Sequence, residues 1–145
     1  MRKCIAILVV SLMLSSCAKV SKEDLSLLNG YWQIEKVVLA DGTDKDYSAN
    51  TSYDYFEIKG TSGFRQKVMP QYDGSFLTNT VKESFTVVFS DEVPRMDYKT
   101  DFAKWSEQLE TLDKNHLVVK NSANIEYHYK KAAPINLLGD GKATK

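Results

Sequence analysis

The chain has 145 residues, of which 43% are hydrophobic and 11% aromatic, with 19 basic and 19 acidic side chains. This length suits one domain that can bury a core without disulfides or a structural metal. The balanced charge argues against a nucleic-acid-binding protein. The composition also excludes collagen-like, repetitive and broadly disordered chains.

The first 16 residues differ from the remainder and have the organisation of a targeting segment. Arg2 and Lys3 precede an apolar run over residues 4–14, which only Ser11 interrupts. A membrane-spanning helix needs ~20 apolar residues, so this run is too short to span a bilayer. It has the length of a signal-peptide core. We therefore predict that residues 1–16 are removed from the mature protein.

The apolar run ends in Leu14-Ser15-Ser16-Cys17, which is a hydrophobic residue, two small residues and a cysteine. This ending resembles the bacterial lipobox, in which the cysteine thiol receives a diacylglycerol and becomes the first mature residue. The resemblance implies lipidation at Cys17 and membrane attachment through acyl chains rather than a spanning helix. A single mature thiol is unusual in an exported protein, and acylation would give it a use. An ordinary secretory signal that ends near a cysteine is the alternative.

Two further features of the sequence bear on the cellular location of the protein. Removal of residues 1–16 leaves 17 basic and 19 acidic residues, which does not suit a polybasic membrane patch or a nucleic-acid groove. Ala18, rather than Asp, follows the cysteine. By resemblance to the enterobacterial sorting rule, we expect a lipid anchor in the outer membrane, on its periplasmic or cell-surface face. Residues 17–26 are polar without an apolar period, which predicts a lipidated cysteine followed by a flexible tether.

From Leu27 onward, strand-like runs alternate with turn residues. The predicted strands, in chain order, are 32–39, 53–59, 64–69, 76–81, 84–90, 95–100, 116–120 and 125–131. Pro70 ends one of them, and Asp73-Gly74 is a hairpin dipeptide. Short strands with short turns predict an all-β domain, either a small antiparallel up-and-down barrel of about eight strands or a sandwich.

The stretch over residues 101–112 is ambiguous. The residues at helical spacing are Phe102, Trp105, Leu109 and Leu112. The alternate positions Trp105, Glu107, Leu109 and Thr111 equally form one face of a strand. We favour a short helical turn through Trp105 that leads into a strand over 108–112, with a continuous strand as the alternative.

The predicted barrel opens with Asn29-Gly30-Tyr31-Trp32, a G-x-W pattern. Lipocalin-type barrels begin in the same way, and residues 112–131 resemble their closing hairpin. The chain over 27–131 thus resembles the lipocalin-like domain common in Bacteroidota lipoproteins, although its middle lacks a clear T-D-Y motif. The resemblance implies that Gly30 and Trp32 form the barrel floor and that Lys130 or Lys131 packs across the tryptophan. It leaves residues 132–145 as a carboxyl-terminal tail.

Catalytic and metal-binding patterns are scarce. The sequence contains no G-x-S-x-G, H-E-x-x-H, P-loop or dinucleotide-binding glycine pattern. Its two histidines, His116 and His128, lie in separate predicted strands near the carboxyl end. The carboxylates over 41–46 are better explained by hairpin-turn chemistry than by calcium binding, because the EF-hand glycine and glutamate are missing. We therefore expect a non-catalytic protein without a metal ion or cofactor.

These observations predict a monomeric, non-catalytic barrel that binds a small hydrophobic or amphipathic ligand in its lumen. Strand alternation places Ile34 beside Trp32 in the interior, and the ligand should bind away from the tryptophan. The predicted ligand-binding residues are Val38, Phe56, Ile58, Phe85, Val87 and Phe89. The alternative is an envelope adaptor or inhibitor-like lipoprotein that binds a protein partner through its outer face or the loops over 41–52 and 91–100.

Overall fold

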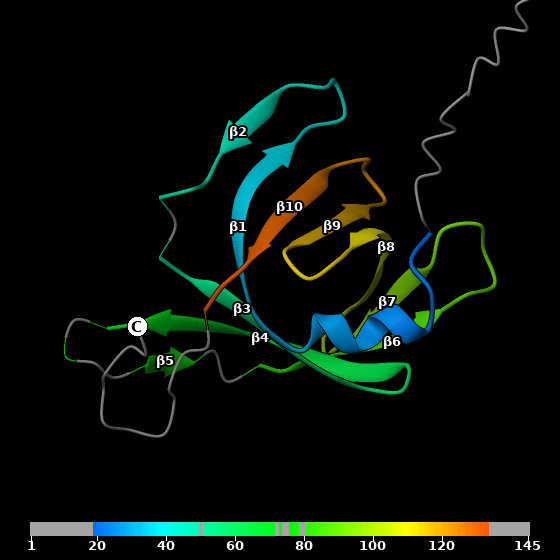
Figure 1. The fold of residues 1–145 in the computed structure, drawn as a ribbon, viewed down its shortest axis with the longest axis horizontal. Coiled ribbons are helices and arrows are strands. Elements are labelled where there is room, and N and C mark those ends of the chain that lie inside the picture. The colour runs from blue at the N-terminus through cyan, green and yellow to red at the C-terminus, as the bar shows by residue number, and fades with distance from the viewer. Residues whose placement is uncertain (1–18, 50, 72, 74–75, 79–80, 134–145) are drawn as a thin grey trace, which may run out of the picture.

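The computed structural model describes residues 19–49, 51–71, 73, 76–78 and 81–133 (Figure 1). The expected signal segment over 1–16, Cys17 and positions 134–145 of the expected tail lie outside the described residues. Within the described ranges, no helix has the length and hydropathy required to cross a bilayer.

Antiparallel strands close into a barrel whose wall follows the order of the chain (Figure 1). The strands of the wall are β1 (Gly30–Val38), β3 (Tyr53–Lys59), β4 (Ser62–Pro70), β6 (Glu83–Val88), β7 (Arg95–Lys99), β8 (Lys104–Leu112), β9 (His116–Asn121) and β10 (Glu126–Lys131). Strand β10 pairs back with β1 and so closes the wall. The structure confirms the predicted up-and-down barrel of eight strands and excludes a sandwich, since every strand of the wall is paired on both sides.

Two short strands extend this wall. Strand β2 (Asp44–Asp46) pairs with the carboxyl-terminal part of β1, whose amino-terminal part pairs with β3. Strand β5 (Phe76–Thr78) pairs with the end of β4, whose beginning pairs with β6. The long loop predicted over 41–52 is therefore partly ordered as a strand, and of the strand predicted over 76–81, residues 76–78 form β5 whereas Val81 lies outside any strand.

One end of the barrel is closed by η1, a 3-10 helix over Glu23–Leu28 (Figure 1). Leu25 and Leu28 are 1% and 0% exposed, and Val20 is also part of the core cluster. The predicted flexible tether is thus wrong from Val20 onward. The few apolar residues of this segment lie among polar neighbours without a period. They are buried because they pack against the apolar end of the barrel.

Strand β8 is continuous from Lys104, so the helical turn favoured through Trp105 is wrong. The pairing of β8 with β9 shifts register between Leu109 and Thr111. This bulge inserts one residue and turns Leu112 inward, beside Leu109. The resulting three-residue spacing between inward leucines imitates the period of a helix.

A second bulge explains an error in β1. The pairing of β1 with β10 shifts between Ile34 and Lys36, so Val37, rather than Val38, becomes the buried residue of the pair. The predicted inward position of Val38 is wrong for this reason. Phe89 is also misplaced by the sequence pattern, because β6 ends at Val88 and the Phe89 side chain is 38% exposed.

The remaining predicted lumen residues, Phe56, Ile58, Phe85 and Val87, are buried in one apolar cluster. The Phe56 and Phe85 rings lie 6.1 Å apart, edge to face, and the Phe85 and Tyr98 rings lie 5.5 Å apart. These side chains pack against each other and against η1, at the end of the barrel that η1 closes. We call this end the closed half of the barrel and the opposite end the open half. The closed half is therefore filled by its own side chains.

Candidate functional site

The floor of the barrel is built around Trp32, whose side chain is fully buried. Its indole Nε1 donates a hydrogen bond of 2.8 Å to the Leu28 carbonyl of η1. The Lys131 ammonium lies 4.5 Å from the centroid of the indole ring and donates to the carbonyls of Leu27 and Asn29. Lys131, rather than Lys130, therefore packs across the tryptophan, and burial lowers the pKa of its ammonium group.

Gly30 allows the chain to pass beneath this floor. Its φ is +118°, a conformation that L side chains rarely adopt. A Cβ atom at this position would lie 3.0 Å from the Lys131 ammonium nitrogen. The glycine of the G-x-W pattern is thus required both for the turn into β1 and for the lysine that covers Trp32.

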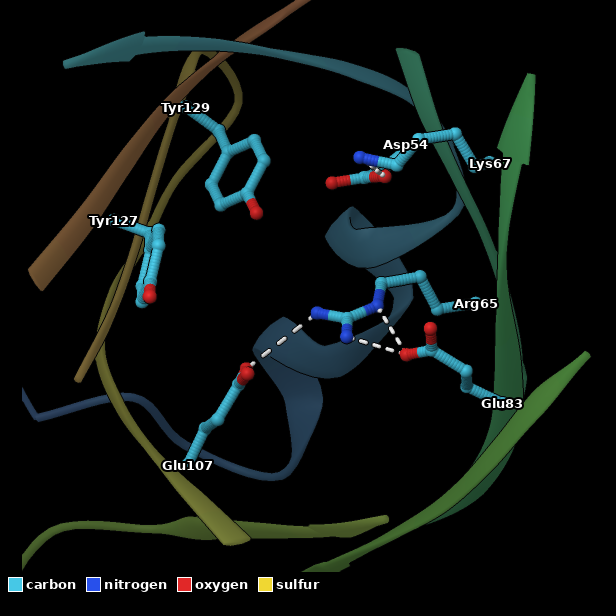
Figure 2. A pocket seen from close by; sticks show the side chains of 7 residues that line it. All are labelled: Asp54, Arg65, Lys67, Glu83, Glu107, Tyr127 and Tyr129. Atoms are coloured by element: carbon cyan, nitrogen blue, oxygen red, sulfur yellow. Dashed lines mark hydrogen bonds and ion pairs between the residues drawn. The ribbon is translucent and has the colours of Figure 1, made fainter. Parts of the chain in front are cut away.

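The open half of the barrel contains a cavity of about 260 Å³ (Figure 2). It is lined by inward-facing residues of β3, β4, β6, β8 and β10. These residues are Asp54, Arg65, Lys67, Glu83, Glu107, Tyr127 and Tyr129. Five of the seven side chains are ionisable as acids or strong bases, so the cavity differs in kind from the apolar lumen that the sequence predicted.

Strand register brings the charges into pairs. Asp54 and Lys67 are direct partners across β3 and β4, and their side chains approach to 3.0 Å. Arg65 and Glu83 are direct partners across β4 and β6, with a 2.9 Å hydrogen bond from Nε to the carboxylate. Residues directly opposite in antiparallel strands project from the same face, so both pairs point into the lumen.

Arg65 lies at the boundary between the two halves of the barrel. Its guanidinium carbon is 4.6 Å from the centroid of the Tyr98 ring, which in turn stacks on Trp105 at 5.2 Å with an interplanar angle of 5°. On β3, the residue directly opposite Arg65 is Phe56, which belongs to the apolar core. The aromatic stack and the Glu83 carboxylate together hold the guanidinium in one place.

Glu107 reaches the cavity from β8, and its side chain is 9% exposed, compared with 29% for Glu83, the other carboxylate that pairs with Arg65. Its Oε2 atom lies 3.6 Å from Arg65 Nη1, which is an ion pair but is too long for a hydrogen bond. Within the described part of the chain, this oxygen has no hydrogen-bond donor. Burial raises the pKa of Glu107, and the nearby Arg65 only partly offsets that effect.

The two tyrosines of β10 form the opposite wall. Figure 2 shows the rings of Tyr127 and Tyr129 across the cavity from Arg65, Asp54 and Lys67. Burial raises the pKa of Tyr129 well above its ordinary value, and the nearby Asp54 carboxylate adds a smaller effect in the same direction. Its phenol therefore keeps a proton that can be donated to a ligand.

None of the seven lining residues was predicted as a binding residue. A signal was present, because Asp54 shares the inward face of β3 with Phe56 and Ile58. Charged residues on the buried face of a strand are unusual and mark a polar site. In β4 the pattern misleads, since Phe64 and Val68 lie on the outer face and the charged Arg65 and Lys67 lie inside.

The other residues considered from sequence lie away from the cavity. His116 is 3.3 Å from Asp113, and His128 is 3.0 Å from Glu126, both on the outer surface. No cluster of three or more metal-ligating side chains occurs among the residues with described positions. Asp41 accepts hydrogen bonds from the backbone and hydroxyl of Thr43, as expected for turn chemistry.

An up-and-down barrel closed by a short helix, with a G-x-W floor, defines the lipocalin class of proteins. A family model described as a lipocalin-like domain matches residues 28–119. The chain therefore belongs to the lipocalin-like domain family. A comparison with curated proteins finds no match.

Solved structures with a similar fold have low sequence identity to this chain. A lipocalin-like protein from Bacteroides uniformis is 14% identical, with a TM-score of 0.47 over 73% of this chain and 99% of that one. Apocrustacyanin C2 is 12% identical, with a TM-score of 0.49 over 79% of this chain and 66% of that one. Lobster apocrustacyanin A1 is 14% identical, with a TM-score of 0.45 over 82% and 73%.

Proposed function

We propose that this protein is a non-catalytic binding lipoprotein, anchored to the outer membrane through Cys17, that holds a small amphipathic ligand in the open half of its barrel. The observation that carries the proposal is the cavity of about 260 Å³ above a packed apolar floor. Ligand cavities usually measure ~300–1,000 Å³, so this one suits a small molecule.

The chemistry of the walls favours an amphipathic ligand over a purely hydrophobic one. One wall presents the rings of Tyr127 and Tyr129, and the other presents ionic side chains (Figure 2). A purely apolar ligand would remove water from these charged groups without replacing its hydrogen bonds, which is costly. The ligand should therefore place polar groups against Arg65 and Glu107 and apolar surface against the tyrosines.

A binding role agrees with the way the charges are arranged. Arg65 and Lys67 each have a carboxylate partner, so they are held by the protein before any ligand arrives. Preorganised side chains lower the entropic cost of binding. Membership of the lipocalin-like family favours the same role.

The anchor is supported by the lipobox resemblance and fits the position of the first buried residue. Val20 belongs to the core cluster, only three positions after Cys17. Three extended residues span ~10 Å at most. Lipidation at Cys17 would therefore hold the closed end of the barrel near the bilayer surface and direct the cavity away from it.

Native mass spectrometry of the full-length chain, purified in detergent from the membranes of its host, tests both parts. We expect an acylated protein that carries a small-molecule mass, which is absent from the double variant Arg65→Met/Glu107→Leu. Cys17→Ser should leave the membrane fraction. Membrane attachment of that variant would overturn the anchor. A copurifying protein in place of the small mass would favour the adaptor hypothesis.

A further inference from the structure

The charges that line the cavity leave one carboxylate without a close cationic partner. Lys67 is 3.0 Å from Asp54, and Arg65 directs two of its nitrogens, Nε and Nη2, to Glu83. Glu107 is the third carboxylate, and its contact with Arg65 is the longer one of 3.6 Å. Two cations thus face three acids around this cavity.

The unpaired oxygen of Glu107 indicates which chemical group is missing. A buried oxygen without a hydrogen-bond donor is unfavourable, and native proteins rarely leave one unsatisfied. An ammonium group supplies both a positive charge and three N–H donors. A hydroxyl group supplies a donor without charge, and a carboxylate supplies neither.

The aromatic wall is compatible with a cation. The rings of Tyr127 and Tyr129 border the same cavity, and a cation near a tyrosine face is attracted by the ring quadrupole. Glu110 and Glu126, two acidic residues on the outside of the barrel, differ from Glu107, because each forms an ion pair with Lys120 on the outer surface.

Resting on the proposed function, we infer that the ligand of this cavity is a small primary amine whose ammonium group binds the Glu107 carboxylate, with its apolar part against Tyr127 and Tyr129. Binding completes the charge balance of the cavity. The inference concerns the class of ligand and leaves the anchor untouched.

Three probes of matched size test this inference: benzylamine, benzyl alcohol and benzoate, titrated by calorimetry into the purified full-length chain. We expect benzylamine to bind more tightly than the other two by about tenfold or more, the effect of a charge-assisted hydrogen bond. Glu107→Gln should remove this preference. Glu110→Gln, which changes an outward carboxylate of the same strand, should preserve it.

Benzylamine should also shift the backbone amide NMR signals of Glu107, Tyr127 and Tyr129, a readout that needs no variant. Equal or tighter binding of benzoate or benzyl alcohol would overturn the amine inference and leave the binding function intact. Failure of all three probes, with a small-molecule mass still retained in native spectra, would overturn the amine inference alone. Failure of the probes together with loss of that mass would overturn both.

Discussion

The closed and open halves of this barrel are built from the same strands but have opposite interiors. In β3, Phe56 and Ile58 face the apolar core, and Asp54, two residues before Phe56, faces the ionic cavity. In β8, Leu109 belongs to the core and Glu107 to the cavity. A continuous wall can therefore carry a packed floor and a polar site. Strand alternation decides whether a side chain points into the barrel, and its position along the strand decides whether it lies in the apolar core or in the ionic cavity.

The two halves are also stabilised by different interactions. Side chains in the closed half are stabilised by removal of apolar surface from water, which requires no particular partner. Charged side chains in the open half are stabilised mainly by partners of opposite charge, since an unpaired buried charge is strongly unfavourable. Substitutions in the floor should thus act through lost volume, and substitutions in the cavity should act through lost partners.

The largest effect is expected at the floor. Trp32→Ala removes a fully buried indole, together with its hydrogen bond to Leu28 and its contact with Lys131. The free energy of unfolding should fall by ~3–5 kcal/mol, the range for emptying a large aromatic site. Chemical denaturation measures this loss. Trp105→Ala, which removes a partly buried indole at the boundary between the two halves, is the matched control, and an equal loss there would contradict the special role of the floor.

A somewhat smaller effect is expected at Arg65. Arg65→Met leaves Glu83 and Glu107 without their shared cation, which should cost about 3 kcal/mol for a buried pair broken on one side. The double variant Arg65→Met/Glu107→Leu should recover the part of this loss that comes from Glu107, because it also removes the more buried of the two unpaired acids. Denaturation of the single and double variants measures the coupling. Additive losses would show that the ion pair has no role in stability.

Gly30→Ala separates conformational strain from crowding. The substitution places a Cβ atom at a φ of +118° and 3.0 Å from the Lys131 ammonium. We expect a loss of ~1–3 kcal/mol from the backbone strain, with an added part from displacement of the lysine. Gly42→Ala provides the comparison, since Gly42 has a φ of +86° but no neighbour within 4 Å. Thermal denaturation that shows equal losses would exclude the contribution of Lys131.

The smallest effect is a pH dependence at Glu107. Burial raises the pKa of its carboxyl above the ordinary 4.5, so the folded state holds a proton more tightly than the unfolded state. Stability from this group is present below pH 4.5 and falls as pH rises through the folded pKa. Relative to the parent, Glu107→Gln should gain stability over that window, by ~1.4 kcal/mol per unit of pKa shift. A difference independent of pH would contradict the raised pKa.

The wall of the barrel could be predicted from local patterns because strand alternation and turn residues are properties of neighbouring residues. The errors have a common cause. Bulges near Ile34 and Leu109 change the direction of every later side chain in β1 and β8, and each depends on pairing with another strand, β10 for β1 and β9 for β8. The helix η1 was missed because Val20, Leu25 and Leu28 become a core only against the end of the barrel.

The residues of the binding cavity were harder to predict from local sequence patterns than the strands of the wall. Asp54 and Lys67, like Arg65 and Glu83, are separated along the chain and meet only through strand register. The residues alone indicate a lipobox-like segment, about eight short strands and a G-x-W pattern, since each of these depends on short-range order. Closure of β10 onto β1 completes the lumen, and one carboxylate oxygen there, Oε2 of Glu107, has no hydrogen-bond donor among the described residues, because charge and packing inside a barrel are set by strands from every part of the chain.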